Sequence, residues 1–284
     1  MTRTILDWLV ENYPTAKRQT LKRMVQANRV AVNERPVKTL KQEICDGDKI
    51  AVDARPAPEL ATQPAQLRII FQDADLLVVD KPIGLLTSTV PNEPRPTLWA
   101  MAKVFFESHE PEARIGLIHR LDRDASGLLI FSKTDLAYQS LKTQFFHHTV
   151  RREYTVIVHG VPLPASGRIE THLVERADGT VHSTRQIGKG QIAVTEYAVV
   201  KSGKKHSVVS VILQTGRKHQ IRVQLSERGW PIVGDTMYGR EDGAKRLMLA
   251  ATRLTIRHPR DEKEMPFTAP MPREFKELEA SMLK

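Results

Sequence analysis

Residues 119–131 read His-Arg-Leu-Asp-Arg-Asp-Ala-Ser-Gly-Leu-Leu-Ile-Phe, a charged segment that runs directly into an apolar one. The apolar part, residues 128–131, has the length and composition of a buried strand, so the charged part is expected to be a polar loop that leads into it. Asp122 stands between Arg120 and Arg123, and neighbouring cations favour the ionised form of a carboxylate. Such a group can act as a nucleophile or a base. Most Asp residues in loops, however, only form turn hydrogen bonds and surface ion pairs.

The rest of the C-terminal part, residues 67–284, mixes strand and helix patterns. Strand-like runs occur at residues 76–79, 128–131, 154–158, 192–200 and 207–213, and helical patterns occur near residues 97–107, 136–146 and 218–228. Gly229 follows the last helical pattern at the position where a C-terminal cap is expected. This order predicts an α+β domain with a mixed, mainly antiparallel sheet.

Residues 1–54 predict a separate, smaller α+β module. Helices are expected around residues 5–10 and 17–27, and short strands near residues 29–32 and 49–52. Residues 55–66 contain three prolines and little apolar periodicity, so we expect a linker there. Cys45 is the single cysteine; it is expected to be a small buried hydrophobe, and a reducing, cytoplasmic environment fits its lack of a disulfide partner.

Charge indicates a polyanionic partner. The chain has 43 Lys and Arg against 33 Asp and Glu, a formal net charge of +10, which favours nucleic acid but is weak evidence alone. The stretch from residue 17 to 29 holds no acidic residue. Its cations, which we expect to contact RNA phosphates, are Lys17, Arg18, Lys22, Arg23 and Arg29. A charge run of this kind is more often only a solvated face. The first ten residues are too short and too polar for a membrane span.

Four motifs in the C-terminal domain resemble those of the RluA-type pseudouridine synthases, in the same order. The segment His-Arg-Leu-Asp-Arg-Asp-Ala-Ser-Gly at residues 119–127 is similar to that family's active-site signature. Asp-Lys-Pro-Ile-Gly-Leu at 80–85 precedes it, and Arg-Glu-Tyr at 152–154 follows it. Thr-Gly-Arg-Lys-His-Gln-Ile-Arg-Val at 215–223 comes last, with Gly-Asp at 234–235 behind it. The resemblance covers about residues 67–275 and implies an isomerase that converts uridines in structured RNA to pseudouridine.

The resemblance also implies roles for particular residues. Asp122 is implied to be the catalytic aspartate, which attacks the anomeric carbon or abstracts a sugar proton, and Arg222 is implied to pair with it. Tyr154 is implied to stack under the base and to assist the final proton transfer. Arg120 is implied to enter the duplex where the target nucleotide leaves it. Two further residues of these motifs, His119 and Arg217, are expected to contact the RNA. Taken alone, Tyr154 has the pattern of a core tyrosine, and Arg222 that of a solvent-facing helical stripe.

The N-terminal module, residues 1–54, resembles the small RNA-binding domain first known from a ribosomal small-subunit protein. The resemblance rests on the basic stretch, the Asn-Arg-Val-Ala-Val-Asn segment at residues 28–33 and the closing Gly-Asp-Lys-Ile at 47–50. It implies that the substrate is ribosomal RNA, with large-subunit RNA favoured. We expect a monomer with no membrane partner. No cofactor is expected, because moving uracil from a nitrogen to a carbon linkage needs no redox change, and no metal is expected.

Three other interpretations remain open from sequence. Asp122 and Asp124 resemble the Asp-x-Asp start of phosphotransferases of the haloacid dehalogenase type, but here the strand follows the motif instead of preceding it. A non-catalytic RNA-binding protein on a synthase scaffold is the second alternative. Transfer RNA as the substrate, in place of ribosomal RNA, is the third. The sequence does not identify the target uridine, because recognition depends on RNA structure as well as on side chains.

Overall fold

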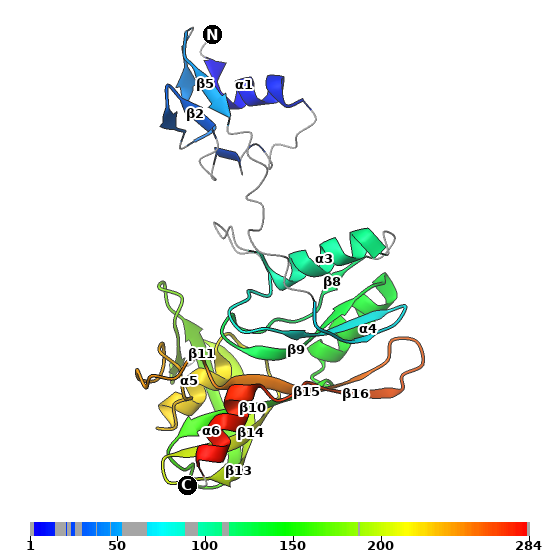
Figure 1. The fold of residues 1–284 in the computed structure, drawn as a ribbon, viewed down its shortest axis with the longest axis vertical. Helices are drawn as coiled ribbons and strands as arrows, with labels where there is room; N and C mark the ends of the chain where they lie inside the picture. Colours follow the sequence, from blue (N-terminus) through cyan, green and yellow to red (C-terminus); the bar gives the residue numbers. More distant parts are fainter. Residues whose placement is uncertain are drawn as a thin grey trace. The chain divides into compact units, whose positions relative to one another are not determined.

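The chain forms two compact units in the computed structural model (Figure 1). One comprises residues 1–64 and 90–95, and the other comprises residues 65–89 and 96–284. The structure describes residues 3–14, 21, 24–25, 30–37, 39–45, 47–52, 67–88, 96–109, 114–186 and 188–282. The segment expected to be a linker, residues 55–66, lies outside the described residues.

The small unit packs one helix and short strands around its own apolar cluster. Its elements are β1 (Arg3–Thr4), α1 (Ile5–Asn12), β2 (Val30–Val32), β3 (Arg35–Pro36), β4 (Glu43–Ile44) and β5 (Ile50–Val52). Helix α1 begins at Thr4, which forms a capping box with Asp7, an arrangement that satisfies two otherwise unpaired amides. Ile5 and Leu9, one helical turn apart, are fully buried against Val30 and its neighbours.

Two sequence predictions for the small unit have different outcomes. Of the helix expected at residues 17–27, only Leu21, Met24 and Val25 are described, and they are helical and buried. The prediction that Cys45 is buried is wrong, because its side chain is exposed. Ile44 takes the inward position of β4, so the next residue along the extended chain faces outward.

The large unit is built on one sheet, which has eleven strands within the described residues. The strand order is β12-β11-β13-β14-β10-β15-β9-β7-β6, with β16 paired to β15 and β8 paired to β9. The strands are β6 (Ile69–Gln72), β7 (Leu76–Lys81), β8 (Gly116–Leu117), β9 (Ser126–Ser132), β10 (Arg151–His159), β11 (Ser166–Glu175), β12 (Val181–Thr184), β13 (Gln191–Ser202), β14 (His206–Leu213), β15 (Leu249–Arg257) and β16 (Glu264–Thr268). The helices are α3 (Leu98–His109), α4 (Asp135–Phe146), α5 (Gln220–Glu227) and α6 (Arg273–Ser281).

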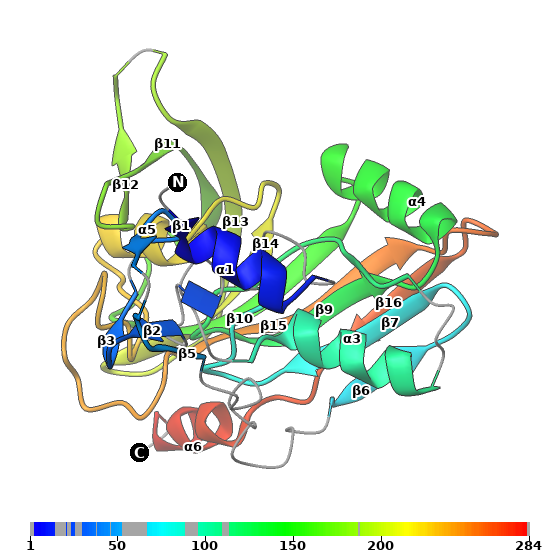
Figure 2. The ribbon, with the colours of Figure 1, turned by 90° about the horizontal axis from the view of Figure 1, so that it is seen from above.

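Strands β7 and β9 are buried along their whole length because a helix covers each of their faces. Leu77 and Leu129 belong to the same apolar cluster as the buried side chains of α3. Their chain neighbours Leu76 and Leu128 point the other way, into a second cluster that contains residues of α4. Figure 2 shows α3 and α4 beside this half of the sheet, and α5 beside the half formed by β11–β14.

The expectation of a mixed, mainly antiparallel sheet is confirmed, since β9 and β15 form the parallel pair and the other strand pairs described are antiparallel. The helix predicted near residues 218–228 ends as expected, with Gly229 in the left-handed region at φ +83°. None of the helices in the described parts of the chain is both long enough and apolar enough to cross a membrane.

Candidate active site

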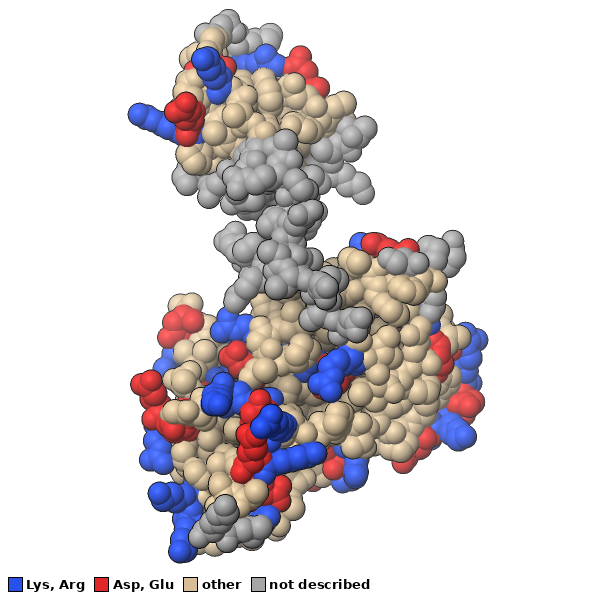
Figure 3. Space-filling model, in the orientation of Figure 1, with Lys and Arg blue, Asp and Glu red and all other residues tan. Residues whose placement is uncertain are grey.

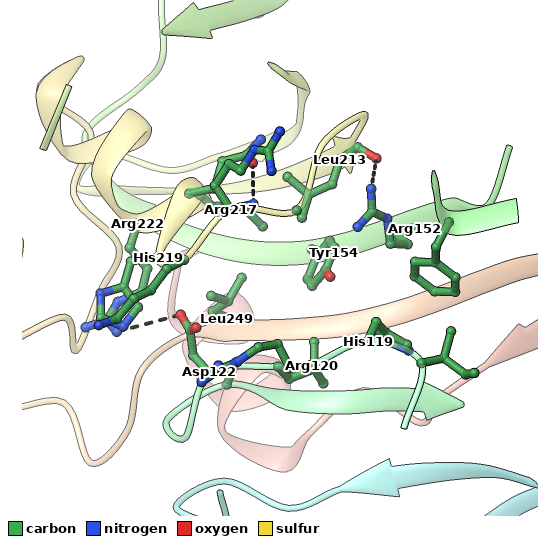
Figure 4. Close-up of a pocket in the computed structure, with 18 of the residues that line it drawn as sticks. His119, Arg120, Asp122, Arg152, Tyr154, Leu213, Arg217, His219, Arg222 and Leu249 are labelled. Carbon is green, nitrogen blue, oxygen red and sulfur yellow. Dashed lines mark hydrogen bonds and ion pairs between the residues drawn. The ribbon is translucent and has the colours of Figure 1, made fainter. Parts of the chain in front are cut away.

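A cavity of about 480 Å³ lies between the loop that precedes β9 and the start of α5. Strand β10 lies near the middle of the sheet and contributes side chains to the cavity. The sheet thereby brings together motifs that are far apart in the sequence (Figure 4). All six site residues predicted in the large unit line this cavity: His119, Arg120, Asp122, Tyr154, Arg217 and Arg222.

The loop that carries Asp122 is held by hydrogen bonds from Lys81, the last residue of β7. The Lys81 side chain is fully buried, and its Nζ donates to the carbonyl oxygens of Pro82 at 3.0 Å, Leu85 at 2.7 Å and Arg123 at 3.1 Å. Burial lowers the pKa of Lys81 to about 8, and the charges of Asp122 and its neighbours oppose that shift. Lys81 therefore joins the loop of residues 82–85 to the loop that carries the candidate catalytic carboxylate.

The other end of this loop is fixed by the close approach of two strands. Ser126 and Gly127 pair in parallel with Ala250 and Ala251. Gly127 has φ +112°, and a Cβ placed there would lie 2.1 Å from the Ala251 carbonyl oxygen. Only glycine fits a backbone contact this close. The loop therefore enters β9 at a defined point, a few residues after Asp122.

Arg222 lies between two carboxylates. Its Nε and Nη2 donate to the two oxygens of Asp235, each at 2.8 Å, and its Nη1 lies 3.8 Å from Oδ2 of Asp122. Burial disfavours the charge of Arg222, but hydrogen bonding to Asp235 and the charges of both carboxylates outweigh it, so its pKa is raised. Arg222 is 4% exposed, so the interpretation of it as part of a solvent-facing stripe is wrong.

Tyr154 forms an aromatic wall of the cavity. It is buried in the same apolar cluster as Leu213 and Leu249, and Figure 4 shows its ring between these two residues, on the cavity side. A register shift in the β10–β15 pairing falls between Glu153 and Tyr154, the kind of irregularity that re-aims a side chain. Burial raises the pKa of the Tyr154 hydroxyl, which therefore stays protonated at neutral pH.

The His119 side chain contacts other residues of the protein. Its Nε2 accepts a hydrogen bond from the amide of Ile130 at 3.2 Å, and its ring stacks on Phe145 with centroids 4.7 Å apart. Burial and the nearby Arg152 cation lower the pKa of His119 to about 3, so the ring is neutral. These contacts fasten the loop to β9. The prediction that His119 contacts RNA remains a prediction.

Arg120 and Arg217 lie at the mouth of the cavity. Arg120 is exposed, whereas Arg217 is half-buried and donates from Nε to the carbonyl oxygen of Ile192 at 3.0 Å. On the face of the large unit that Figure 3 draws, basic and acidic side chains are interspersed. The positions of the cations around the cavity therefore say more about where RNA would bind than the net charge does.

Sequence reasoning assigned no role to two residues that the structure places close to Asp122. Asp235 binds Arg222 and also accepts from the amides of Met237 and Tyr238, at 3.1 and 3.0 Å. His219 lies near Asp122 and bonds to the Tyr238 hydroxyl at 2.7 Å. The sequence signal for Asp235 is the Gly-Asp pair at residues 234–235, which follows the last of the four motifs.

Five predicted RNA contacts lie outside the described residues, namely Lys17, Arg18, Lys22, Arg23 and Arg29. Among the residues that are described, no group of three or more His, Cys, Asp or Glu side chains is arranged to hold a metal ion. That finding does not test the prediction of metal-free chemistry.

Comparison with known proteins identifies the family. The family model described as RNA pseudouridylate synthase matches residues 75–227, which include the Asp122 loop, Tyr154 and Arg222. An uncharacterised RNA pseudouridine synthase of Bacillus subtilis is 33% identical, over 94% of this chain and 90% of that protein. The ribosomal large subunit pseudouridine synthase D of Yersinia pestis is 30% identical, over 95% of this chain and 88% of that protein.

A solved structure agrees with these relatives. The human RNA pseudouridylate synthase domain containing 4 is similar at a TM-score of 0.62 and 25% identity, over 73% of this chain and 90% of that chain. The matched part of the sequence contains every side chain that lines the cavity except Leu249. The chain therefore belongs to the RNA pseudouridylate synthase family and is an RNA pseudouridine synthase.

Proposed function

We propose that this synthase modifies specific uridines in ribosomal RNA of the large subunit, with Asp122 as its catalytic carboxylate. The observation that carries the catalytic part is the position of Asp122, which faces the cavity with the buried Arg222 behind it at 3.8 Å. The substrate part is supported by relatives such as that of Yersinia pestis, whose name specifies the ribosomal large subunit.

The reaction changes the uracil ring atom through which the base is joined to the ribose. The bond between N1 and the ribose C1′ breaks, a bond between C5 and C1′ forms, and the hydrogen on C5 is lost while N1 gains a proton. Atoms and electrons balance without an oxidant or a donor group. Asp122 acts either as a nucleophile at C1′ or as a base toward a sugar proton. Both roles need the carboxylate form of the side chain, and Arg222 places a buried cation 3.8 Å from it.

The detached uracil must stay in the site while it turns. The cavity walls near Asp122 combine the Tyr154 ring with the apolar side chains of Leu213 and Leu249. An aromatic ring of this kind can stack on the base and hold it in several orientations. Because burial keeps the Tyr154 hydroxyl protonated, any help in the final proton transfer comes from a neutral hydroxyl group.

The target must leave its helix to reach this cavity, since a stacked base is inaccessible. Extrusion costs a few kcal/mol of unstacking. Arg120 is exposed at the mouth of the cavity, and its guanidinium can fill the space that the target vacates. Arg217 lies on the other side of the opening, on the segment that leads into α5, where it can contact a phosphate.

The small unit serves in this proposal as an RNA-binding attachment, residues 1–54, joined by a linker to the catalytic domain, residues 67–284. Its compact apolar cluster supports a folded module. We propose that its basic residues Lys17 to Arg29 contact phosphates. Action on ribosomal RNA supports a cytoplasmic location. We further take the enzyme to be a monomer that works without a cofactor, since the isomerisation needs no redox change and no donor group.

The experiment combines purified enzyme with cells. Unmodified large-subunit and small-subunit ribosomal RNA transcripts and transfer RNA, each labelled with tritium at uridine C5, are incubated with the protein, because pseudouridine formation releases that tritium. Pseudouridine maps of cells with and without the gene identify the same positions in vivo. Release from the large-subunit transcript, with loss of the matching pseudouridine in the deletion strain, supports the proposal. Release from transfer RNA alone contradicts the substrate assignment.

A further inference from the structure

Helix α4 ends at the mouth of the cavity with two phenylalanines that face different surroundings. Phe145 is half-buried, stacks on His119 and lies under the guanidinium of Arg152. Phe146 lines the same cavity but is 77% exposed. The protein therefore uses the first ring for its own packing and presents the second ring to solvent beside the site.

The exposure of Phe146 is unusual for the large unit. The other strongly exposed large apolar residues described there are aliphatic or Met side chains, such as Leu136 and Val200. Single exposed apolar residues are common on protein surfaces and need no special explanation. A bare aromatic ring at the opening of an active-site cavity is different, because its position relates it to whatever enters that cavity.

The surroundings of Phe146 suit a nucleic acid. The ring of His147 lies edge-on to it, with centroids 5.1 Å apart, and His148, Arg120 and Arg217 also line the opening. Burial and the nearby cations Arg152 and Arg217 lower the pKa of His148, so the positive charge at this opening comes from Arg120 and Arg217. Aromatic rings next to basic side chains are the usual means by which proteins hold unstacked nucleotides, the rings taking bases and the cations taking phosphates.

We propose that Phe146 stacks on the base of an RNA nucleotide adjacent to the target uridine, while Arg217 contacts the neighbouring phosphate. The proposal rests on the proposed function, since it assumes that the target uridine occupies the cavity beside Asp122 and Tyr154. The stacked base must be unpaired, because a paired base keeps both faces inside its own helix. Phe146 therefore favours targets in loops or bulges, or sites that open when the target is extruded.

Stacking of this kind adds affinity with little preference for one base, because every base has a π-face. Replacing the ring should weaken binding of RNA and leave chemistry on bound RNA largely intact. Phe146→Tyr keeps the aromatic face, whereas Phe146→Leu keeps apolar area without it. Leu136→Ala is the matched control, because Leu136 is an exposed apolar residue of the same helix that does not line the cavity.

The test measures the Kd for an unmodified large-subunit RNA transcript and the single-turnover rate of tritium release at saturating enzyme. Phe146→Ala and Phe146→Leu should weaken binding about 5-fold or more, the loss expected of one base–aromatic stack. Phe146→Tyr and Leu136→Ala should bind within 2-fold of the unaltered protein, on the order of experimental scatter for a preserved contact. Thermal unfolding without RNA should be unchanged in all four variants, because Phe146 and Leu136 are both exposed.

The outcomes separate this proposal from the function on which it rests. If the unaltered protein releases tritium and Phe146→Ala binds RNA normally, the stacking proposal is wrong and the function stands. If RNA binding depends on the ring but no transcript is modified, the function is wrong and the ring is still an RNA contact. Destabilisation of Phe146→Ala in the absence of RNA would mean that the ring is covered by another part of this chain, which also contradicts the proposal.

Discussion

Arg222 binds Asp235 through two parallel hydrogen bonds of 2.8 Å and leaves Nη1 free to face Asp122 at 3.8 Å. The two-bond contact fixes the plane of the guanidinium, because its nitrogens and the carboxylate oxygens are held in one geometry. Asp235 therefore determines where the Arg222 charge lies relative to Asp122. Asp235 is itself only 1% exposed, so removing either partner leaves a buried charge without its counter-ion.

Arg222→Met should abolish most activity and lower the free energy of unfolding. It leaves the buried Asp235 without its cation, and breaking a buried pair costs about 3–5 kcal/mol. Arg222→Lys keeps the charge but cannot form both bonds, so it should lose activity with a smaller loss of stability. Denaturant unfolding and single-turnover tritium release measure the two effects. Near-normal activity of Arg222→Met would show that the ion pair with Asp122 is not used.

Asp122→Asn should abolish pseudouridine formation while RNA binding stays within a few-fold of the unaltered protein. The substitution keeps the size of the side chain and removes the reactive anion. Asp178→Asn is the control, because Asp178 is an exposed carboxylate in a turn that does not line the cavity. Turnover by Asp122→Asn at saturating enzyme, with tritium release as the readout, would remove Asp122 from the role proposed for it.

The sequence predicts the position of Asp122 well because the polar loop and the apolar strand behind it are adjacent in the chain. Strands β7, β9, β10, β13 and β14 are predicted for the same reason, since their apolar runs are continuous. The burial of Arg222 could not be predicted locally. His219 and Ser226 suggest a polar helix face. The buried position of Arg222 is stabilised by its two hydrogen bonds to Asp235, which lies outside the helix in the sequence.

Strand β11 is missed because few of its residues are buried and its charged residues interrupt the apolar ones. Its register with β13 is set by long-range pairing, which a single-sequence pattern does not contain. Strand β15 is missed although it is apolar, since the Leu-Ala-Ala start at residues 249–251 fits a helix as well as a strand. The parallel contact with Gly127 decides between these possibilities.

Gly234→Ala should damage activity more than an equivalent change elsewhere in the same loop. Gly234 precedes Asp235 and has φ +77°, and a Cβ there would lie 1.9 Å from the carbonyl oxygen of Arg246. Backbone must move to relieve that overlap, and Asp235 would move with it. Gly243→Ala is the matched control, because Gly243 has φ +72° with open space around it.

Gly243→Ala should therefore show only the cost of a left-handed alanine, about 1–2 kcal/mol, with near-normal tritium release. Denaturant unfolding reports the stability of both variants. Equal activity of the two alanine variants would show that the position of Asp235 is not critical for the reaction.

The single-turnover rate should fall as pH rises through about 8, the pKa to which burial lowers Lys81. The ammonium group donates to three carbonyl oxygens, and a neutral amine has only two hydrogens to donate. The effect on folding has the opposite sign. Because this pKa lies below the 10.5 of free lysine, protonated Lys81 disfavours the folded state below pH 8, and that penalty disappears as pH rises from 8 to 10.5.

Asp124→Asn provides the test of this assignment. The charge of Asp124 raises the pKa of Lys81, so its removal should move the alkaline fall in rate to lower pH. Asp178→Asn, at an exposed turn, removes the same charge without a contribution to the Lys81 pKa. If Asp124→Asn leaves the alkaline fall in rate at the same pH, that fall is caused by the titration of another group, such as the RNA itself.

Replacing Arg18, Lys22 and Arg23 together by Ala should weaken binding to large-subunit ribosomal RNA and flatten its dependence on salt. Each phosphate that a cation neutralises adds roughly 0.7 to 0.9 to the slope of log affinity against log salt. The chemistry should remain, because the residues proposed to perform it, Asp122, Tyr154 and Arg222, belong to the other unit. The defect should therefore appear in Kd and target choice, with a near-normal single-turnover rate at saturating enzyme.

The matched control replaces Arg35, Lys41 and Lys49, three exposed cations of the same unit that lie outside the basic stretch. Both triple variants lower the net charge equally, so a general loss of attraction to RNA would affect them alike. A specific phosphate contact predicts a flatter slope for the first variant alone, with circular dichroism showing that both remain folded. Equal slopes for the two variants, or a large loss of the saturated rate in the first, would mean that the basic stretch is not a separable RNA-binding surface, because its charge would then act either diffusely or on the catalytic step itself.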